Sequence, residues 1–447
     1  MKKQFWCGIV AAMALFVVGC GGPSLSPTPG QEPGKQIITV GIYGFDEYDS
    51  GLGPVLMDMK TKFPNYLFKT QRHEVTFETE YQVAQQFALD TMAGKTEDVV
   101  IFPVGFLNSP YHAVQQGYFE DLEPYIENNP GFPMNDLFLP IWNAGLTDGK
   151  RYVMPLSFDY RPIITTAEAL QRMGYSADHP FTLDEWTDWA VKTREEHGQP
   201  LLYSMLPDML APMHYSFILL SGCPNPCDLA ARTADFDTLG FRQGLRFVEE
   251  LYKNQGLLNL REGNSEKAFR QWGGGQWGIN NWLEGILLPG VSENFRINNV
   301  DQQPLPIGYP HMGEGSGDIG FVHRVVAVNG FSKEKQAAAD FCMAMMDTQV
   351  QTNILLDEEE NNRSHLMSLP VNRQAIKNYA DSTSFRPSKA FLDAYVTCLE
   401  SIQRGMLYDQ NLENIIGKEI EKYMDGNVTE DQLIQTLNQR VNLYLKE

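Results

Sequence analysis

Aromatic residues and hydrogen-bonding side chains occur together in five short segments between residues 44 and 324. Flat aromatic rings pack on the C–H faces of a sugar ring, and carboxylate, amide and guanidinium groups exchange hydrogen bonds with its hydroxyls. These residue types favour a neutral, hydroxyl-rich ligand, although a peptide or a polyol could use the same groups. The candidate ligand-binding residues are Phe45, Asp46, Glu47, Phe106, Asn108, Asp159, Tyr160, Arg161, Asn281, Trp282, Phe321 and Arg324.

The patterns of several enzyme classes are missing. The sequence has no G-x-S-x-G nucleophile elbow, no H-E-x-x-H zinc motif and no Walker loop. Its eight histidines show no metal-ligand spacing, so neither a metal nor another cofactor is expected. Residues 315–320 match G-x-G-x-x-G, but a loop precedes them and a β-rich run follows, which is the wrong context for a dinucleotide. The 56 acidic residues cannot be sorted into acid and base, so a glycoside hydrolase stays an alternative.

Length and charge restrict the class of protein further. A chain of 447 residues is longer than one hydrophobic core usually serves, which predicts two lobes. The content of 43% hydrophobic and 11% aromatic residues is that of a folded globular protein. A net charge of −21 argues against nucleic acid or an anionic membrane face as a partner.

The N-terminal segment has the pattern of an export signal. Lys2 and Lys3 precede an apolar stretch over 8–18, which has signal-peptide length and is too short to span a bilayer. It ends in Val-Val-Gly-Cys, which resembles a lipobox, where the cysteine is lipidated and becomes the new N-terminus; the alternative is a chance cysteine after a cleaved signal. We therefore expect a signal peptide over 1–19 and, over 20–36, a Gly/Pro/Ser-rich tether anchored by lipid on Cys20.

Four cysteines follow Cys20 in the sequence. Export permits disulfides, and the Pro-Asn-Pro interior between Cys223 and Cys227 can turn the chain so that the two thiols meet. A Cys223–Cys227 disulfide is therefore predicted, with a metal site as the weaker alternative. Cys342 and Cys398 lie in helical patterns and are predicted to be buried thiols.

Strand and helix patterns alternate from residue 37 onward. β-rich runs predict strands over 37–43, 73–79 and 97–102, and helical spacing of apolar residues predicts helices over 54–62 and 83–92. This order is typical of a parallel sheet in a doubly wound α/β lobe.

Capping boxes mark the starts of two further helices. Thr182 and Glu185 form one Thr-x-x-Glu box, and Thr429 with Gln432 forms the second, at the start of the closing helix. Apolar residues follow Gln432 at four-residue spacing, so one face of the closing helix is predicted to be buried.

The segment over 149–170 predicts a crossing between two lobes. Its pattern is G-x-x-Y-x-x-P-x-S-x-D-x-R, followed by a second β-rich run and a helix start. Pro155 interrupts the first β-rich run, and side-chain donors and acceptors gather behind it. Further motifs lie at 93–100 (AGKTEDVV), 269–282, 321–328 (FVHRVVAV), 369–373 (LPVNR) and 425–447.

In their order and spacing, these motifs resemble the extracellular solute-binding proteins of ABC importers, in the sugar-binding branch that includes maltose-binding protein. The resemblance covers nearly the whole chain from about residue 37. Two places depart from the usual pattern: Glu97 stands where proline is usual, and Trp277 and Asn281 replace small residues.

The resemblance implies an α/β, bilobal periplasmic-binding-protein fold of type II, with two doubly wound lobes joined by three hinge crossings. It places those crossings near residues 157–160, 321–325 and 370–373, and it places Trp282 as an aromatic platform in the cleft between the lobes. Lobe 1 would consist of 37–157 and 325–371, and lobe 2 of 158–324 and 372–447.

The same resemblance implies a function. It points to a monomer, lipid-anchored on the extracytoplasmic side of the cell membrane, that captures a carbohydrate and delivers it to ABC permease subunits. The expected ligand is an oligosaccharide. A surface enzyme acting on carbohydrate, an adhesion or scaffold lipoprotein, and a binding protein for a peptide or polyol remain the alternatives.

Overall fold

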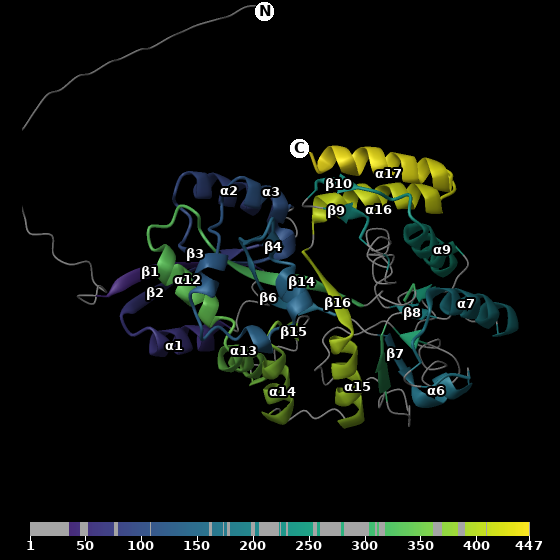
Figure 1. Cartoon of the computed structure of the whole chain (residues 1–447), viewed down its shortest axis with the longest axis horizontal. Helices are drawn as coiled ribbons and strands as arrows, with labels where there is room; N and C mark the ends of the chain where they lie inside the picture. Colours follow the sequence, from purple (N-terminus) through teal and green to yellow (C-terminus); the bar gives the residue numbers. More distant parts are fainter. Residues whose placement is uncertain are drawn as a thin grey trace, which may run out of the picture.

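The structure, a computed structural model, describes most of the chain after the tether (Figure 1). It contains two large β-sheets with helices packed around each. The described residues are 35–446 apart from 45–51, 76–78, 108, 161–162, 173, 177–178, 198–201, 205–222, 224, 229–230, 254–256, 260–278, 281–303, 309–310, 313–317, 361–368, 383–388 and 408.

The larger sheet has seven described strands in the order β15-β6-β14-β3-β1-β2, with β16 also paired to β14. β1 runs parallel to β2 and to β3, as the alternating pattern predicts, while β14 runs antiparallel to β3 and β6. The strands are β1 (Gln36–Gly44), β2 (Tyr66–Glu74), β3 (Val99–Pro103), β6 (Met154–Asp159), β14 (Asp318–Val328), β15 (Leu369–Pro370) and β16 (Ile402–Leu407).

The second strand lies earlier in the sequence than the predicted 73–79. β2 begins at Tyr66 and pairs with β1 along its whole length, from Gln36↔Tyr66 to Gly44↔Glu74. The aromatic run at its start packs against the first core, so the strand begins directly after the turn that follows α1 (Leu52–Lys62).

The smaller sheet has five described strands in the order β11-β8-β12-β7-β13. β7 follows β6 after a short connection, so the chain passes from one sheet directly into the other. The strands are β7 (Ile163–Thr166), β8 (Leu202–Ser204), β11 (Leu257–Asn259), β12 (Ile279–Asn280) and β13 (Pro304–Ile307). Two short antiparallel pairs add β4 (Leu146–Thr147) with β5 (Lys150–Arg151), and β9 (Cys227–Asp228) with β10 (Thr233–Ala234).

Helices cover both sheets (Figure 1). Around the larger sheet lie α2 (Glu80–Met92), η1 (Val104–Leu107), α3 (Pro110–Gln115), α4 (Glu123–Glu127), η2 (Met134–Asp136), α5 (Leu139–Asn143), α12 (Lys335–Ala344), α13 (Thr348–Glu360) and α14 (Arg373–Ser382). The remaining helices are α6 (Ala167–Arg172), α7 (Leu183–His197), α9 (Leu239–Lys253), α15 (Lys389–Glu400), α16 (Gln410–Met424) and α17 (Glu430–Tyr444).

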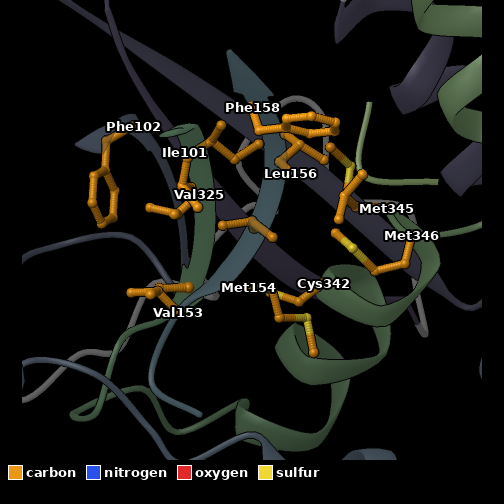
Figure 2. Packing of buried hydrophobic residues seen from close by; sticks show 14 of the residues in the cluster. Ile101, Phe102, Val153, Met154, Leu156, Phe158, Val325, Cys342, Met345 and Met346 are labelled. Carbon is orange, nitrogen blue, oxygen red and sulfur yellow. The ribbon is translucent and has the colours of Figure 1, made fainter. Parts of the chain in front are cut away.

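Two separate hydrophobic cores confirm that the molecule is bilobal. The first core takes its residues from 38–160 and 322–407, and the second takes its residues from 170–319 and 412–445. In the first core, Figure 2 shows Met154 and Leu156 of β6 beside the sulfur-containing side chains at the end of α12. Cys342, one of those side chains, is buried as predicted, and so is Cys398.

The chain changes core three times, which locates the crossings. The first two changes, over 160–170 and 319–322, lie close to the predicted positions. The third lies over 407–412, so its predicted position at 370–373 is wrong, and so is the lobe boundary placed there. After residue 373 the chain returns to the first core, because α14 packs on α13 and β16 joins the larger sheet beside β14.

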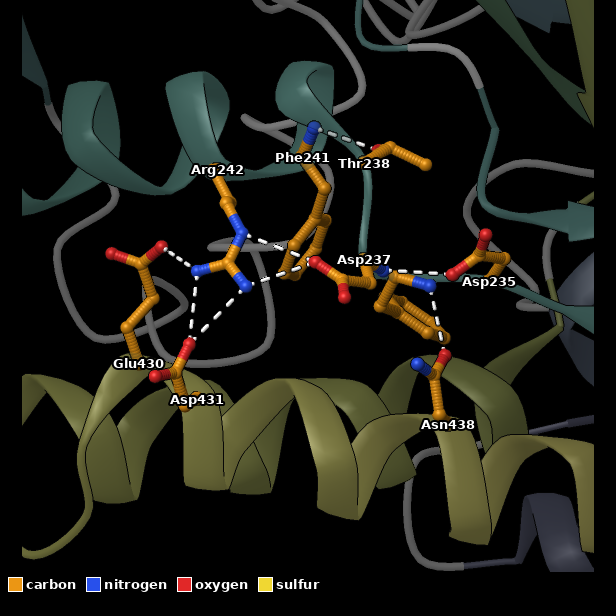
Figure 3. A network of polar contacts seen from close by, with 9 residues as sticks. Asp235, Asp237, Thr238, Phe241, Arg242, Glu430, Asp431 and Asn438 are labelled. Atoms are coloured by element: carbon orange, nitrogen blue, oxygen red, sulfur yellow. Dashed lines mark hydrogen bonds and ion pairs between the residues drawn. The ribbon is translucent and has the colours of Figure 1, made fainter.

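The C-terminal helices belong to the second lobe, as predicted. Figure 3 shows Arg242 of α9 between Asp237 and the start of α17, where it pairs with Glu430 and lies 3.2 Å from Asp431. The capping box at that start is confirmed: Thr429 accepts from the N–H of Gln432, whose side chain accepts from the N–H of Thr429. The capping box between Thr182 and Glu185 is also present.

Cys223 and Cys227 lie in the second core, and both are buried. Both are thiols in the structure, so the predicted disulfide between them is not formed there. Burial in this apolar surrounding raises the pKa of the Cys223 thiol to about 12.

Candidate functional site

Three neighbouring strands of the larger sheet carry partly exposed side chains at the same level, where β14 passes from one lobe to the other. β14 is otherwise buried, yet Phe321, His323 and Arg324 are partly exposed. Phe321 lies opposite Asp159 of β6, and Arg324 lies opposite both Ser157 of β6 and Pro103 of β3. We call this set the crossing strip: Pro103, Ser157, Asp159, Phe321, His323 and Arg324.

Irregular pairing gives the strip its exposed side chains. The register between β14 and β6 shifts between Val322 and Arg324 and again between Arg324 and Val325. Such bulges re-aim side chains and occur next to functional sites. They explain why His323 and Arg324, which are adjacent in the sequence, are both partly exposed.

The strip offers complementary hydrogen-bonding groups beside one aromatic ring. Asp159 supplies acceptors, Arg324 supplies several N–H donors, and Phe321 supplies a flat apolar surface. The hydroxyl oxygen of Ser157 is buried and makes no hydrogen bond within the described part of the chain. A buried hydroxyl without a partner is uncommon, so it marks a place where a ligand or water can complete the bonding.

Two described elements of the same lobe end directly before further predicted residues in the sequence. β1 ends at Gly44, before Phe45, Asp46 and Glu47, and the turn after β3 ends at Leu107, before Asn108. In open α/β sheets, ligands bind outside the carboxyl ends of the strands. The predicted residues that lie outside the described residues are Phe45, Asp46, Glu47, Asn108, Arg161, Asn281 and Trp282, together with Cys20.

Of the predicted ligand-binding residues that the structure describes, it brings three together. Asp159, Phe321 and Arg324 all lie in the crossing strip. The prediction missed Ser157 and His323. Both could have been found from the sequence, since each interrupts an otherwise apolar strand with a polar side chain.

Phe106 and Tyr160 are buried and do not offer a surface to a ligand. Phe106 is 0% exposed and packs in the first core, with ring centroids 5.1 Å from Tyr43 and 5.8 Å from Phe87. The 3₁₀ turn after β3 directs this ring inward. Tyr160 is 2% exposed, and its hydroxyl donates to the carboxylate of Asp318. Both assignments as ligand-contacting residues are therefore wrong.

A buried polar cluster fixes the strand ends beside residues 45–51. Tyr43 of β1 stacks on His73 of β2, with ring centroids 4.2 Å apart and planes 4° apart. Glu97 accepts from the Tyr43 hydroxyl at 3.3 Å, and its other oxygen lies 2.8 Å from His73 Nε2. A Cβ on Gly41 would lie 2.6 Å from the Glu97 carboxylate, so a larger residue there would displace that side chain. Glu97, which replaces the usual proline, thus joins β1 to β2.

Replacing Glu97 by alanine is expected to lower the free energy of unfolding by about 1–3 kcal/mol, because the buried Tyr43 hydroxyl and the His73 ring lose their acceptor. Urea denaturation would measure the change. Glu97→Gln, which keeps the shape and one acceptor oxygen, serves as the matched control and should lose less. Equal stability of Glu97→Ala and the parent would mean that the cluster does not hold the strands.

Within the described residues, no helix combines the length and apolar character needed to cross a bilayer. The same residues contain no group of three or more histidine, cysteine, aspartate and glutamate side chains arranged to hold a metal ion.

The sequence matches no family model and no curated protein. The fold, by contrast, matches solved structures over more than nine-tenths of the chain. The sugar-binding protein MalE from Xanthomonas citri has a TM-score of 0.67 at 17% identity, covering 92% of this chain and 98% of its own. The cyclic alpha-maltosyl-1,6-maltose binding protein from Arthrobacter globiformis gives 0.66 at 17% identity, with 92% and 100% covered. The GacH receptor of Streptomyces glaucescens gives 0.58 at 15% identity, with 92% and 98% covered.

These comparisons, together with the two cores and three crossings, define the class of fold. The chain has the bilobal, type II periplasmic-binding-protein fold, as the sequence pattern predicts. At these identities the likeness establishes the fold alone.

Proposed function

We propose that this protein is the substrate-binding component of an ABC importer, and that it captures a carbohydrate between its lobes and delivers it to the permease. The observation that carries the proposal is the crossing strip, where Asp159 lies opposite Phe321, and Arg324 lies opposite Ser157, beside the passage of β14 from one lobe to the other. A ligand there would touch strands that lead into both cores, so binding can bring the lobes together by hinge rotation.

Chemistry supports a sugar as the ligand. A pyranose ring has C–H faces and several hydroxyls. The ring of Phe321 suits those faces, and the hydroxyls can bond to Asp159 as acceptor, to Arg324 as donor and to the Ser157 hydroxyl. The proteins of like fold are named for sugar binding, for a cyclic maltosyl-maltose and, in the case of GacH, for a complex with acarbose. A cleft between lobes can hold more than one ring, which favours an oligosaccharide over a peptide or a polyol.

The protein is proposed to bind its sugar without cleaving it. Most glycoside hydrolases use two carboxyl groups that flank the bond to be broken. In the described part of the strip Asp159 is the one carboxylate, since the nearby Asp318 is fully buried and accepts from Tyr160 and Ser401. The structures of like fold described above are named as binding proteins or a receptor.

The proposed location is the extracytoplasmic side of the cell membrane, where lipid on Cys20 would hold the chain through the tether over 20–36. The protein would act there as a monomer. Because the net charge of −21 repels an anionic membrane surface, the attachment would come from the lipid and not from electrostatic attraction.

A thermal-shift screen tests the proposed function. The chain from residue 21 would be mixed with maltotriose, cellotriose, sorbitol and a tripeptide, each at millimolar concentration. An oligosaccharide present at 100 times its Kd is expected to stabilise the fold by about 2.7 kcal/mol. The gain should disappear in Arg324→Ala, which removes the donors of the strip. A shift with the tripeptide alone, or steady release of reducing sugar ends, would contradict the proposal.

A further inference from the structure

The three crossings share one buried carboxylate. Asp318, the first residue of β14, is 0% exposed. Its Oδ2 accepts from the Tyr160 hydroxyl and lies 2.9 Å from the Ser401 hydroxyl, whose one proton is shared with the carbonyl oxygen of Cys398 at 2.6 Å. Its Oδ1 lies 3.8 Å from Nε2 of His311.

The carboxylate and its two donors lie on chain segments that lead into different crossings. Tyr160 follows β6 and stands directly before the first crossing, and Asp318 stands at the second. Ser401 directly precedes β16, which leads to the third crossing over 407–412. The carboxylate, which itself leads into the second crossing, therefore contacts residues of the segments that lead into the first and the third.

Two further described neighbours of the carboxylate, His311 and Gly308, belong to the second lobe. His311 exchanges backbone hydrogen bonds with Phe181 and Leu183 at the start of α7, at 2.8 Å each. Gly308, which follows β13, lies so close that a Cβ there would be 3.0 Å from Asp318 Oδ2. The carboxylate is thus enclosed by both lobes as well as by the crossings.

We propose that Asp318 is a positioning residue that couples the three crossings, so that they bend as one hinge when the lobes close. A carboxylate enclosed in this way depends on its donors, and hydrogen bonds to a charged acceptor are about twice as strong as neutral ones. Burial, with the neighbouring Asp318 charge, raises the pKa of Tyr160 well above its usual value, which keeps the phenol protonated as a donor.

The hinge contact is also adjacent to the proposed ligand site. Asp159 directly precedes Tyr160, and Phe321 follows Asp318 by three residues on the same strand. A ligand that displaces Asp159 or Phe321 of the crossing strip would therefore also displace Tyr160 or Asp318. This link to the ligand rests on the proposed function, whereas the coupling of the crossings rests on the fold alone.

A second contact between the lobes does not involve Asp318. Ser109, at the start of α3, donates to Asp409 at 2.8 Å, and the Tyr444 hydroxyl lies 3.0 Å from both oxygens of that carboxylate. This contact stays intact in variants of Tyr160 and Ser401, so it does not obscure their effect.

Hydrogen exchange in the protein without ligand tests the coupling. The variants are Tyr160→Phe and Ser401→Ala in the chain from residue 21, which contains both cores. Tyr160→Phe is expected to speed amide exchange about tenfold in β6, directly before the substitution, and also in β16. Ser401→Ala is expected to do the same in β16, beside the substitution, and also in β6. Exchange in β1 and β2 should stay at the parent rate.

Matched controls remove the same groups from carboxylates within a single lobe. Tyr423→Phe removes a hydroxyl that donates to Glu249 at 2.9 Å in the second lobe, and Ser332→Ala removes one that donates to Asp98 at 2.7 Å in the first. Neither should change exchange at the crossings. Acceleration confined to the substituted segment, or equal acceleration in the controls, would overturn the coupling.

A distance measurement gives an independent readout of hinge stiffness. Spin labels on Met57→Cys of α1 and Leu239→Cys of α9 use two exposed positions, one in each lobe. The distribution of distances between them should broaden in Tyr160→Phe and in Ser401→Ala, and not in the two controls. Distributions identical to the parent's in both variants would overturn the proposal. Because both experiments are made without ligand, failure of any sugar to bind would leave their outcome unchanged.

Discussion

Alanine in place of Trp282 is expected to weaken sugar binding about ten- to a hundredfold, with the melting midpoint of the ligand-free protein close to that of the parent. Trp282 directly follows Asn281 and the short strand β12, which belongs to the sheet of the second lobe. The resemblance to sugar-binding proteins implies that its indole is a platform for a sugar ring in the cleft. The loss would therefore concern the ligand and not the fold.

The magnitude follows from the area that an indole face covers. Stacking on a pyranose removes ~50–100 Å² of apolar surface from water, which is a part of the 150–250 Å² that a whole aromatic side chain buries. At roughly 25 cal/mol per Å², this contact contributes about 1–3 kcal/mol. Isothermal titration with the oligosaccharide that gives the largest thermal shift would measure the change in Kd.

Trp189 provides the matched control, since it is a tryptophan with a known place in the second core. Its side chain is buried and stacks on Phe181, with ring centroids 5.5 Å apart. Trp189→Ala should cost about 3–5 kcal/mol of stability, the usual loss for a large core aromatic. If Trp282→Ala lowered the ligand-free midpoint as much as this control, and bound sugar normally where folded, Trp282 would be a core residue.

Features set by local sequence were predictable. The capping boxes at Thr182 and Thr429 depend on residues three positions apart, and both are present. The parallel pairing of β1 with β3 follows from alternating strands and helices. The first two crossings could be placed because a proline, or polar residues within a β-rich run, mark them in the sequence.

The third crossing could not be placed in this way, because its position depends on contacts between distant segments. The motif over 369–373 does form a strand, β15, that pairs with β6. Yet the chain then adds α14 against α13 and β16 against β14 before it leaves the first core. Nothing in the local pattern near residue 370 distinguishes a chain that crosses from one that returns.

The candidate site was predictable only in part, because contacts between distant segments decide which side chains are buried. Phe106 and Phe321 are both aromatic residues near strand ends, and the sequence gives them equal weight. Burial separates them: Phe106 packs among three other aromatic rings, while Phe321 remains partly exposed. The role of Tyr160 depends on Asp318 and Ser401, which lie 158 and 241 positions away in the sequence, so only the folded chain reveals it.

Replacing Cys20 by alanine is expected to move the protein from the membrane to the soluble extracytoplasmic fraction, with its fold unchanged. The reason is that burial of acyl chains contributes about 0.8 kcal/mol per methylene, and a stable anchor needs more than one chain. Without the thiol there is no site for these chains at the end of the tether. The first described strand, β1, begins only at Gln36, so the substitution lies outside both cores.

Cys7→Ala is the matched control, because Cys7 would be removed with the signal peptide and should not affect anchoring. Fractionation of cells followed by intact mass of the purified chains would compare the two variants with the parent. The parent and Cys7→Ala should carry the mass of lipid on residue 20, and Cys20→Ala should not. A Cys20→Ala protein that was processed normally and stayed as firmly bound as the parent would show that another segment holds this chain at the membrane.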